Sequence, residues 1–446
     1  MTDEMKLTKE EETSLLRWQE RQERKAIKAE GCRTSALDKP PQGQPAAAHT
    51  FEYADDRAKL TIPKIAASLE VDYLRRERGE LVGELTVRCS MPGVRTFKGV
   101  VSVSNFNLSS ARARADRAKL LSSRTEGSAE VIEGIDWHGY IEELCQRVLT
   151  AERTGQPAID LRTFPAPEHD DAHKIDGLVL PRRHPSILFG DGGACKSLIA
   201  LYVLIKLAER GFRIALFDWE LSGVEHRQRL ERIAGPDMPI IHYVKCIRPL
   251  VYEVDRLTCL VRDNRIDYAV YDSVVFATSG PAETSEAANS YFQAVRKIGV
   301  GSLHVAHVSK GENNDQRPFG SIFYHNAARS TYFVKAADAS PDGRETTVGL
   351  YNRKANLSRL HPPTGFTIRF ENDRTIFTQS NPADDPDLAT KLSIRERLYH
   401  TLRDGEQNID DLAEEFNVQP QSIRNAASRG KKLFVIHGGR IGLAYD

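Results

Sequence analysis

The sequence has no long apolar segment, no cluster of cysteines and no excess of charge of either sign. No run approaches the roughly 20 apolar residues that span a bilayer, and the first residues are charged. The six cysteines among 446 residues lie far apart without a C-x-x-C pair, which argues against a zinc site or a disulfide framework. We therefore expect a soluble chain in the reducing cytoplasm, with no membrane partner.

The charges balance, with 62 Lys and Arg residues against 62 Asp and Glu residues. No overall field attracts the chain to a polyanion, so any nucleic-acid site has to be a local patch. A chain of this length is too long for one ordinary core and predicts about two to four domains. The sequence has no internal repeat and no zinc-binding primase signature.

Proline-rich and polar stretches divide the chain. Thr8 and Glu11 stand at the spacing of a capping box and open a helix over residues 8–30, followed by the linker-like KPPQGQPAAAH. A second proline-rich stretch and a later polar spacer mark two further boundaries. We expect a helix and linker over 1–50, an α+β domain over 51–155, a linker over 156–174, a region of strands and helices over 175–380, and a separate module over 388–446.

Residues 51–155 contain apolar, β-rich segments joined by a charged turn, and then two helical patterns. The first helix, over residues 111–121, places four basic side chains within three turns. A solvated basic face is the favoured interpretation, and contact with nucleic acid is the alternative. The four residues are Arg112, Arg114, Arg117 and Lys119.

Residues 175–380 alternate short apolar strands with helical patterns, which predicts a mostly parallel sheet covered by helices on both faces. Sheets of this kind collect ligands at the carboxyl ends of their strands. The expected strands cover residues 186–189, 213–219, 268–272, 303–308 and 330–334, and the expected helices cover 197–210, 224–233 and 284–298.

The segment GDGGACKS, residues 190–197, has the composition of a phosphate-binding loop. An apolar strand precedes it and an apolar helix follows, which is the context that such a loop requires. Backbone amides cradle the phosphates, Lys196 reaches the β- and γ-phosphates, and the Ser197 hydroxyl binds Mg²⁺. The predicted nucleotide-binding residues are Gly190, Asp191, Gly192, Gly193, Ala194, Cys195, Lys196 and Ser197.

Cys195 departs from the pattern G-x-x-x-x-G-K-[ST], because a glycine usually stands there. A side chain at this position projects where the backbone passes close to phosphate, which puts nucleotide affinity in doubt. We expect the side chain to be tolerated. A thiol with a lowered pKa at the positive end of the helix is the alternative.

Three polar residues end neighbouring strands and supply what hydrolysis needs besides a phosphate loop. Asp272 is placed to hold Mg²⁺ together with Ser197, and Glu220 is placed to activate the attacking water. His307 is a candidate sensor of the γ-phosphate. Each also has a plain structural interpretation, as a strand cap or a satisfied polar side chain.

The order of GDGGACKS, LFDWE, VYDS, the segment over 307–334 and YNRKAN resembles the RecA-like ATPases of the plasmid RepA and DnaB hexameric helicase type, over roughly residues 175–375. The resemblance is closest to the RepA-like branch. It implies that Glu220 activates water and that His307 senses the γ-phosphate. It also implies that a loop over 309–319, with Lys310 and Arg317, grips single-stranded DNA in the ring's central pore.

The same resemblance gives Arg353 and Lys354 the role of basic fingers that reach the nucleotide of the neighbouring subunit. Hydrolysis then depends on assembly, because one subunit completes the site of the next. An exposed basic pair on a turn is the structural alternative.

The last sixty or so residues resemble a winged-helix domain, with helices over 392–402, 409–416 and 419–428 and a terminal hairpin. The third helix is the presumed recognition helix, and basic residues beside it are placed to meet phosphates. Docking of a protein is the alternative use of such a module. The predicted DNA-binding residues here are Arg424, Arg429, Lys431, Lys432 and Arg440.

Together these features predict an α/β protein with a RecA-like P-loop NTPase core, flanked by a small α+β domain and a winged helix. The expected function is Mg²⁺–ATP-dependent DNA translocation or unwinding by a homo-oligomeric ring, expected as a hexamer, in replication of a mobile element. Single-stranded and double-stranded DNA, and a loader or primase, are the expected partners. The alternatives are an ATPase that remodels proteins on DNA, and a nucleotide-gated DNA-binding regulator without turnover.

Overall fold

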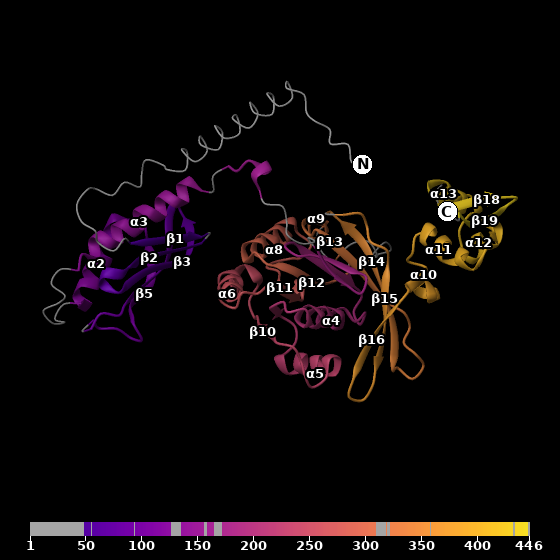
Figure 1. The fold of residues 1–446 in the computed structure, drawn as a ribbon, viewed down its shortest axis with the longest axis horizontal. Helices are drawn as coiled ribbons and strands as arrows, with labels where there is room; N and C mark the ends of the chain where they lie inside the picture. Colours follow the sequence, from indigo (N-terminus) through magenta and orange to yellow (C-terminus); the bar gives the residue numbers. More distant parts are fainter. Residues whose placement is uncertain are drawn as a thin grey trace, which may run out of the picture. The chain divides into compact units, whose positions relative to one another are not determined.

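The computed structural model describes residues 49–54, 56–92, 94–125, 135–155, 158–164, 172–308, 318, 322–356, 358–430 and 433–444. The helix predicted over residues 8–30 lies outside these ranges, as does nearly all of the linker after it. The chain divides into two compact units, Met1–Leu161 and Arg162–Asp446 (Figure 1). Within the described ranges, no helix has the length and apolar character that crossing a membrane requires.

The first unit is a five-stranded antiparallel sheet with two helices on one face (Figure 1). Inward-facing side chains alternate with outward-facing ones along β4, as expected for a sheet with one buried face. Its elements are β1 Thr50–Ala54, β2 Arg57–Ile62, β3 Ala67–Glu77, β4 Glu80–Cys89, β5 Val100–Asn107, α2 Ala111–Thr125 and α3 Trp137–Thr154.

Two of the four basic side chains singled out over residues 111–121 bind other elements of this unit. The Arg114 guanidinium pairs with Glu142 of α3 at 2.6 Å, and Arg117 donates to the Ser102 hydroxyl of β5 at 2.7 Å. Arg117 is half-buried, and burial lowers its pKa. These two residues anchor α2 to its neighbours, so the helix does not present all four charges as one open basic face.

The second unit is built on a nine-stranded sheet in the order β10-β9-β11-β12-β8-β13-β14-β15-β16. The first six strands in this order are parallel, and the last three extend the sheet as an antiparallel meander. The strands are β8 Pro185–Gly190, β9 Ile214–Asp218, β10 Ile241–Lys245, β11 Tyr268–Asp272, β12 Gly301–His307, β13 Ser330–Ala336, β14 Glu345–Ala355, β15 Thr364–Phe370 and β16 Thr375–Ser380.

Helices cover both faces of this sheet (Figure 1). Side chains of α4 form one buried cluster with one face, and side chains of α6 and α8 form a second cluster with the other. The helices of this region are α4 Lys196–Glu209, α5 Gly223–Ala234, α6 Leu250–Asp263, α7 Val274–Ala277, α8 Ser285–Ile298 and α9 Ile322–Ala327, and a small hairpin, β6 Ala172–Ile175 and β7 Leu178–Pro181, precedes β8.

The predicted α/β fold with a mostly parallel sheet covered by helices is confirmed. The order of the parallel strands places β8, which carries the phosphate-loop sequence, between β12 and β13. Sequence analysis missed β10, α6 and the antiparallel strands β14, β15 and β16. The strand β10 lies at the sheet edge and buries only Val244 fully, so its sequence lacks the apolar run of a central strand.

The last part of the chain has a small core of its own, around Leu398, Leu412 and Ile423. Two helices joined by a short turn precede a hairpin whose second strand also pairs with a short strand. The elements are α10 Pro386–Ala389, α11 Ile394–Thr401, β17 Gln407–Asn408, α12 Ile409–Glu415, α13 Pro420–Arg429, β18 Phe434–His437 and β19 Arg440–Leu443.

Candidate active site

The loop between β8 and α4 has a shape that requires glycine at its start. A Cβ atom on Gly190 would lie 2.2 Å from the Val334 carbonyl oxygen of β13, so only glycine fits. Gly193 has a φ of 80°, in the left-handed region, and both Gly192 and Gly193 border open space. The helix α4 begins directly after the loop, and its first amides lack intrahelical acceptors. An anion at this position accepts hydrogen bonds from those amides and is stabilised by the positive end of the helix dipole.

Cys195 adopts the backbone conformation that a glycine usually supplies here. Its φ is 57° and its ψ is 18°, a left-handed conformation that costs a non-glycine residue roughly 1 kcal/mol. The side chain is partly buried against the cluster beneath α4, and its sulfur lies 3.7 Å from the Gly193 carbonyl oxygen. The alternative of a lowered thiol pKa is wrong. Burial raises the pKa, and the charges of Lys196 and Arg229 do not offset it.

We therefore expect the Cys195 thiol to react slowly with alkylating reagents. At pH 7.5 its alkylation by iodoacetamide should be several-fold slower than that of free cysteine, because less of it is thiolate. The rate should keep rising above pH 9, since a raised pKa moves ionisation to higher pH. Peptide mass spectrometry measures the labelling, and a Cys195→Ser chain identifies the peptide. Rapid labelling at pH 7 would contradict this assignment.

Lys196 is the first residue of α4, and its side chain is buried, with 6% exposure. The ammonium donates to the Asp191 carbonyl oxygen at 2.5 Å, so it reaches back across the loop. Burial lowers its pKa, and the charges of Asp272, Asp191 and Glu220 oppose that shift. The ammonium thus lies between the loop and the acidic strand ends.

Asp272 ends β11 and is 2% exposed. Among the described residues, its Oδ1 atom has no hydrogen-bond partner. Burial raises its pKa to about 6, a hydrogen bond from Ser197 lowers it, and the charge of Glu220 raises it. A buried carboxylate oxygen without a partner beside a hydroxyl fits the needs of Mg²⁺, which takes few protein ligands and completes its shell with phosphates and water.

Glu220 and His307 come to the same edge of the sheet. His307 is paired with Gly190 in the register of β12 and β8, so it stands beside the start of the loop. Burial and the charge of Lys196 lower the pKa of His307, and the charge of Glu220 raises it. The Glu220 side chain is exposed. The structure therefore brings Lys196, Ser197, Asp272, Glu220 and His307 to one edge.

Arg353 and Lys354 lie elsewhere in the same chain. Both Lys354 and Ile187 are paired with Thr331, three residues before β8 reaches Gly190. At about 3.3 Å per residue, Lys354 stands about 10 Å toward the amino ends of the parallel strands. The Lys354 backbone is therefore not placed at the phosphate loop of its own chain.

Each residue of this pair also has contacts within its own chain. The Arg353 guanidinium stacks over the rings of Tyr351 and Phe333, at 5.3 and 5.7 Å. The Lys354 ammonium donates to the carbonyl oxygens of His325 and Asn326 at the end of α9, both at 2.7 Å. Lys354 thus has a structural role that sequence analysis did not foresee.

The predicted DNA-binding residues differ in their exposure and ion pairing, and several of them lie outside the described residues. Arg424 and Arg429 are exposed on α13. Arg440 pairs with Glu406 at 2.9 Å, so part of its charge is already neutralised. Lys310, Arg317, Lys431 and Lys432 lie outside the described residues.

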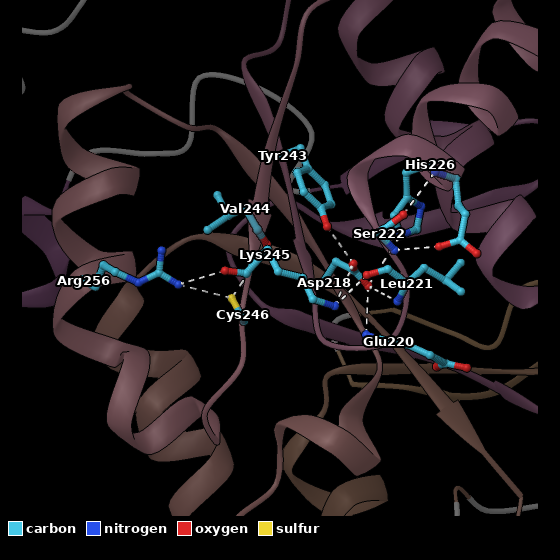
Figure 2. A network of polar contacts seen from close by, with 11 residues as sticks. Asp218, Glu220, Leu221, Ser222, His226, Tyr243, Val244, Lys245, Cys246 and Arg256 are labelled. Carbon is cyan, nitrogen blue, oxygen red and sulfur yellow. Dashed lines mark hydrogen bonds and ion pairs between the residues drawn. The ribbon is translucent and has the colours of Figure 1, made fainter.

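Sequence analysis missed the residues that hold Glu220 in place. Figure 2 shows Asp218, two residues earlier, receiving contacts from its own loop, from β10 and from α5. Asp218 is fully buried at the end of β9. The sequence does show a second acid, Asp218, shortly before Glu220 at the end of a strand. The partners of Asp218 come from segments distant in sequence, so no local pattern reveals them.

No protein-family model matches the chain, and no curated protein matches it. Two solved structures show a likeness. One is a KaiC-like protein from the archaeon Pyrococcus horikoshii, with 14% identity and a TM-score of 0.35 over 45% of this chain and 91% of that one. The other is the ATPase domain of G40P, with 14% identity and a TM-score of 0.36 over 45% of this chain and 86% of that one. At these values neither likeness carries a function to this chain, and the fold assignment rests on strand order and on the phosphate loop.

Proposed function

We propose that this chain is a Mg²⁺-dependent ATPase that translocates along DNA or unwinds it as a homo-oligomeric ring. One observation carries the proposal. A glycine-bearing loop with a buried lysine, a buried carboxylate with one oxygen lacking a partner among the described residues, an exposed glutamate and a histidine meet at the carboxyl edge of the parallel strands. This is the set of groups that phosphoryl transfer to water needs, because such catalysis depends on positioning and charge stabilisation.

The proposed roles follow from these positions. Lys196 binds the β- and γ-phosphates once it leaves the Asp191 carbonyl, and the loop amides bind the remaining phosphate oxygens. Ser197 and Asp272 hold Mg²⁺, which neutralises charge on the phosphates when bound. Glu220 orients the attacking water and accepts its proton. His307, beside Gly190, responds to the γ-phosphate.

A ring accounts for the position of Arg353. Arg353 lies on β14, in the antiparallel extension of the sheet, and the nucleotide of a neighbouring subunit is its proposed target. Hydrolysis would then require assembly, as the resemblance to RepA and DnaB ATPases implies. We propose a hexamer.

The C-terminal elements support a winged-helix domain that contacts duplex DNA. Residues 416–419 join α12 to α13, and α13 buries Ile423 and Ala427 while exposing Gln421, Arg424 and Arg429. An exposed polar and basic helix face of this kind suits phosphate and base contacts. The loop over 309–319 remains the proposed contact to single-stranded DNA.

The rate of ATP hydrolysis with and without single-stranded DNA tests the proposal. We expect turnover by the native chain that DNA stimulates and that requires Mg²⁺, with Lys196→Ala as the background control. Strand separation on a forked duplex distinguishes a helicase from an ATPase that remodels proteins on DNA. Absence of turnover in the native chain would overturn the proposal.

A nucleotide-gated regulator is the second candidate, and the left-handed Cys195 is the observation that favours it. A side chain at this point crowds the backbone that approaches phosphate. The regulator predicts ATP binding without turnover by the native chain and turnover by Cys195→Gly. The ATPase predicts turnover by both.

A further inference from the structure

A single buried carboxylate oxygen holds the backbone of the Glu220 segment. Asp218 Oδ1 accepts the backbone N–H groups of Glu220 and Leu221, each at 2.9 Å. Two amides converging on one oxygen fix the chain direction directly after β9. The Glu220 side chain itself is exposed, so its position depends on its backbone.

The other oxygen of Asp218 is held by the edge strand β10. Asp218 Oδ2 accepts from the Tyr243 hydroxyl at 2.9 Å and lies 3.4 Å from the Lys245 ammonium (Figure 2). Lys245 is paired with Asp218 in the register of β10 and β9. The same ammonium donates to the Leu221 carbonyl oxygen at 2.6 Å. Lys245 thus contacts both the carboxylate and the segment that the carboxylate orients.

Two further contacts join this segment to its surroundings. His226 of α5 lies with Nε2 3.4 Å from Asp218 Oδ1, and Ser222 and Glu225 form a capping box that starts α5 immediately after the segment. Between Asp218 and Glu220, the Trp219 N–H donates to the Asp272 carbonyl oxygen at 2.7 Å. The backbone that carries Glu220 is therefore bonded directly to the residue proposed to hold Mg²⁺.

We propose that Asp218 is a positioning residue for hydrolysis, and that Tyr243 and Lys245 of the edge strand hold its carboxylate in place. The proposal rests on the proposed function, in which Glu220 activates water. Through Asp218, the edge strand β10 sets where the Glu220 backbone lies relative to Asp272. Asp218 touches neither nucleotide nor water in this scheme.

The carboxylate is suited to this role because all of its partners are donors. Each oxygen of Asp218 receives two donors, and these come from backbone amides, a phenol and an ammonium. Burial alone would raise the pKa of Asp218, but the contact with His226 and the hydrogen bonds from the two amides and Tyr243 bring it well below its usual value. An Asn at this position has the same shape but turns an NH₂ group toward one set of donors. It therefore cannot satisfy both sets.

The test compares Asp218→Asn and Tyr243→Phe in the full chain, with kcat and KM for ATP measured at saturating DNA and Mg²⁺. We expect kcat to fall about 10- to 100-fold in Asp218→Asn while KM stays within about threefold, because a displaced general base affects the chemical step rather than binding. Tyr243→Phe removes one donor and should lower kcat about 3- to 10-fold. The double variant should lose less than the product of the two effects, since both act through one carboxylate.

Tyr332→Phe is the matched control. It also removes a buried tyrosine hydroxyl of the same sheet, one that bonds the backbone of Val179, and it should lower stability without changing kcat. Hydrogen exchange at the Glu220 and Leu221 amides gives a readout apart from activity. These amides should lose protection in Asp218→Asn and keep it in Tyr332→Phe.

The outcomes separate this inference from the proposed function. A native chain that hydrolyses ATP, with an unchanged kcat or unchanged exchange at the two amides in Asp218→Asn, overturns the positioning role and leaves the ATPase standing. A native chain without turnover overturns both. A fall in kcat in Tyr332→Phe equal to that in Tyr243→Phe also overturns the inference, because general loosening of the sheet would then explain the effect.

Discussion

Glu220→Gln is expected to lower the rate of ATP hydrolysis by at least about 100-fold while ATP affinity stays within about threefold, in line with the usual contribution of a general base. Glu220 is the exposed acid at the edge where Lys196, Asp272 and His307 meet. An amide keeps the shape of the side chain but cannot accept the proton from water. The binding groups are left in place, so the defect should lie in kcat.

Rapid-quench measurement of phosphate release and titration with a fluorescent ATP analogue give the two quantities. Glu231→Gln is the matched control, because Glu231 is an exposed glutamate on α5 within the same region and has no proposed role. Its kcat should equal that of the native chain. Full activity in Glu220→Gln would mean that another group activates water, and the assignment of Glu220 would have to be abandoned.

Arg353→Ala is expected to reduce hydrolysis by on the order of 100- to 1000-fold, because a finger delivered in trans stabilises charge on the γ-phosphate in the transition state. A finger delivered in trans is identified by complementation between two inactive variants. A mixed ring of Arg353→Ala and Glu220→Gln chains should regain activity, because an intact pocket on one chain meets an intact arginine on the next. At equal amounts, about a quarter of the interfaces have this arrangement, so about a quarter of native activity is expected.

Two variants refine this result. Arg353→Lys retains the charge but loses the planar fork and the stacking on Tyr351 and Phe333, so it should recover only part of the activity. Lys354→Met tests the neighbouring candidate, whose ammonium already bonds the carbonyl oxygens of His325 and Asn326, and it should mainly lower the melting temperature. If Arg353→Ala chains mixed with Glu220→Gln chains stay inactive, delivery in trans is excluded.

The phosphate loop of the site could be predicted from sequence because its residues are neighbours in the chain. A phosphate loop is a continuous segment in which glycine, lysine and serine stand at fixed spacing between an apolar strand and an apolar helix. Asp272, Glu220 and His307 were predictable for a related reason, because each lies at or just after the end of an apolar strand and parallel strands end at one edge. The charge of Glu220 raises the pKa of both Asp272 and His307, as expected for groups gathered at one edge.

Other features depended on pairing and burial, which no local pattern encodes. Cys195 stands at a helix start, where a lowered pKa was the alternative, but packing against the core raises that pKa. Arg114 and Arg117 were first considered as parts of a basic face, and the structure shows them bonded to Glu142 and Ser102. Exposure and partners are properties of the folded chain.

The sequence by itself determined the sheet-and-helix class and the place of the phosphate loop, because backbone preferences and the period of apolar residues act over a few neighbouring positions. Only the tertiary structure decided that Asp218 would lie between its own loop and the edge strand β10, and that Arg353 would lie over the rings of Phe333 and Tyr351. Both depend on strand order and register, which arise when segments far apart in the chain share one sheet.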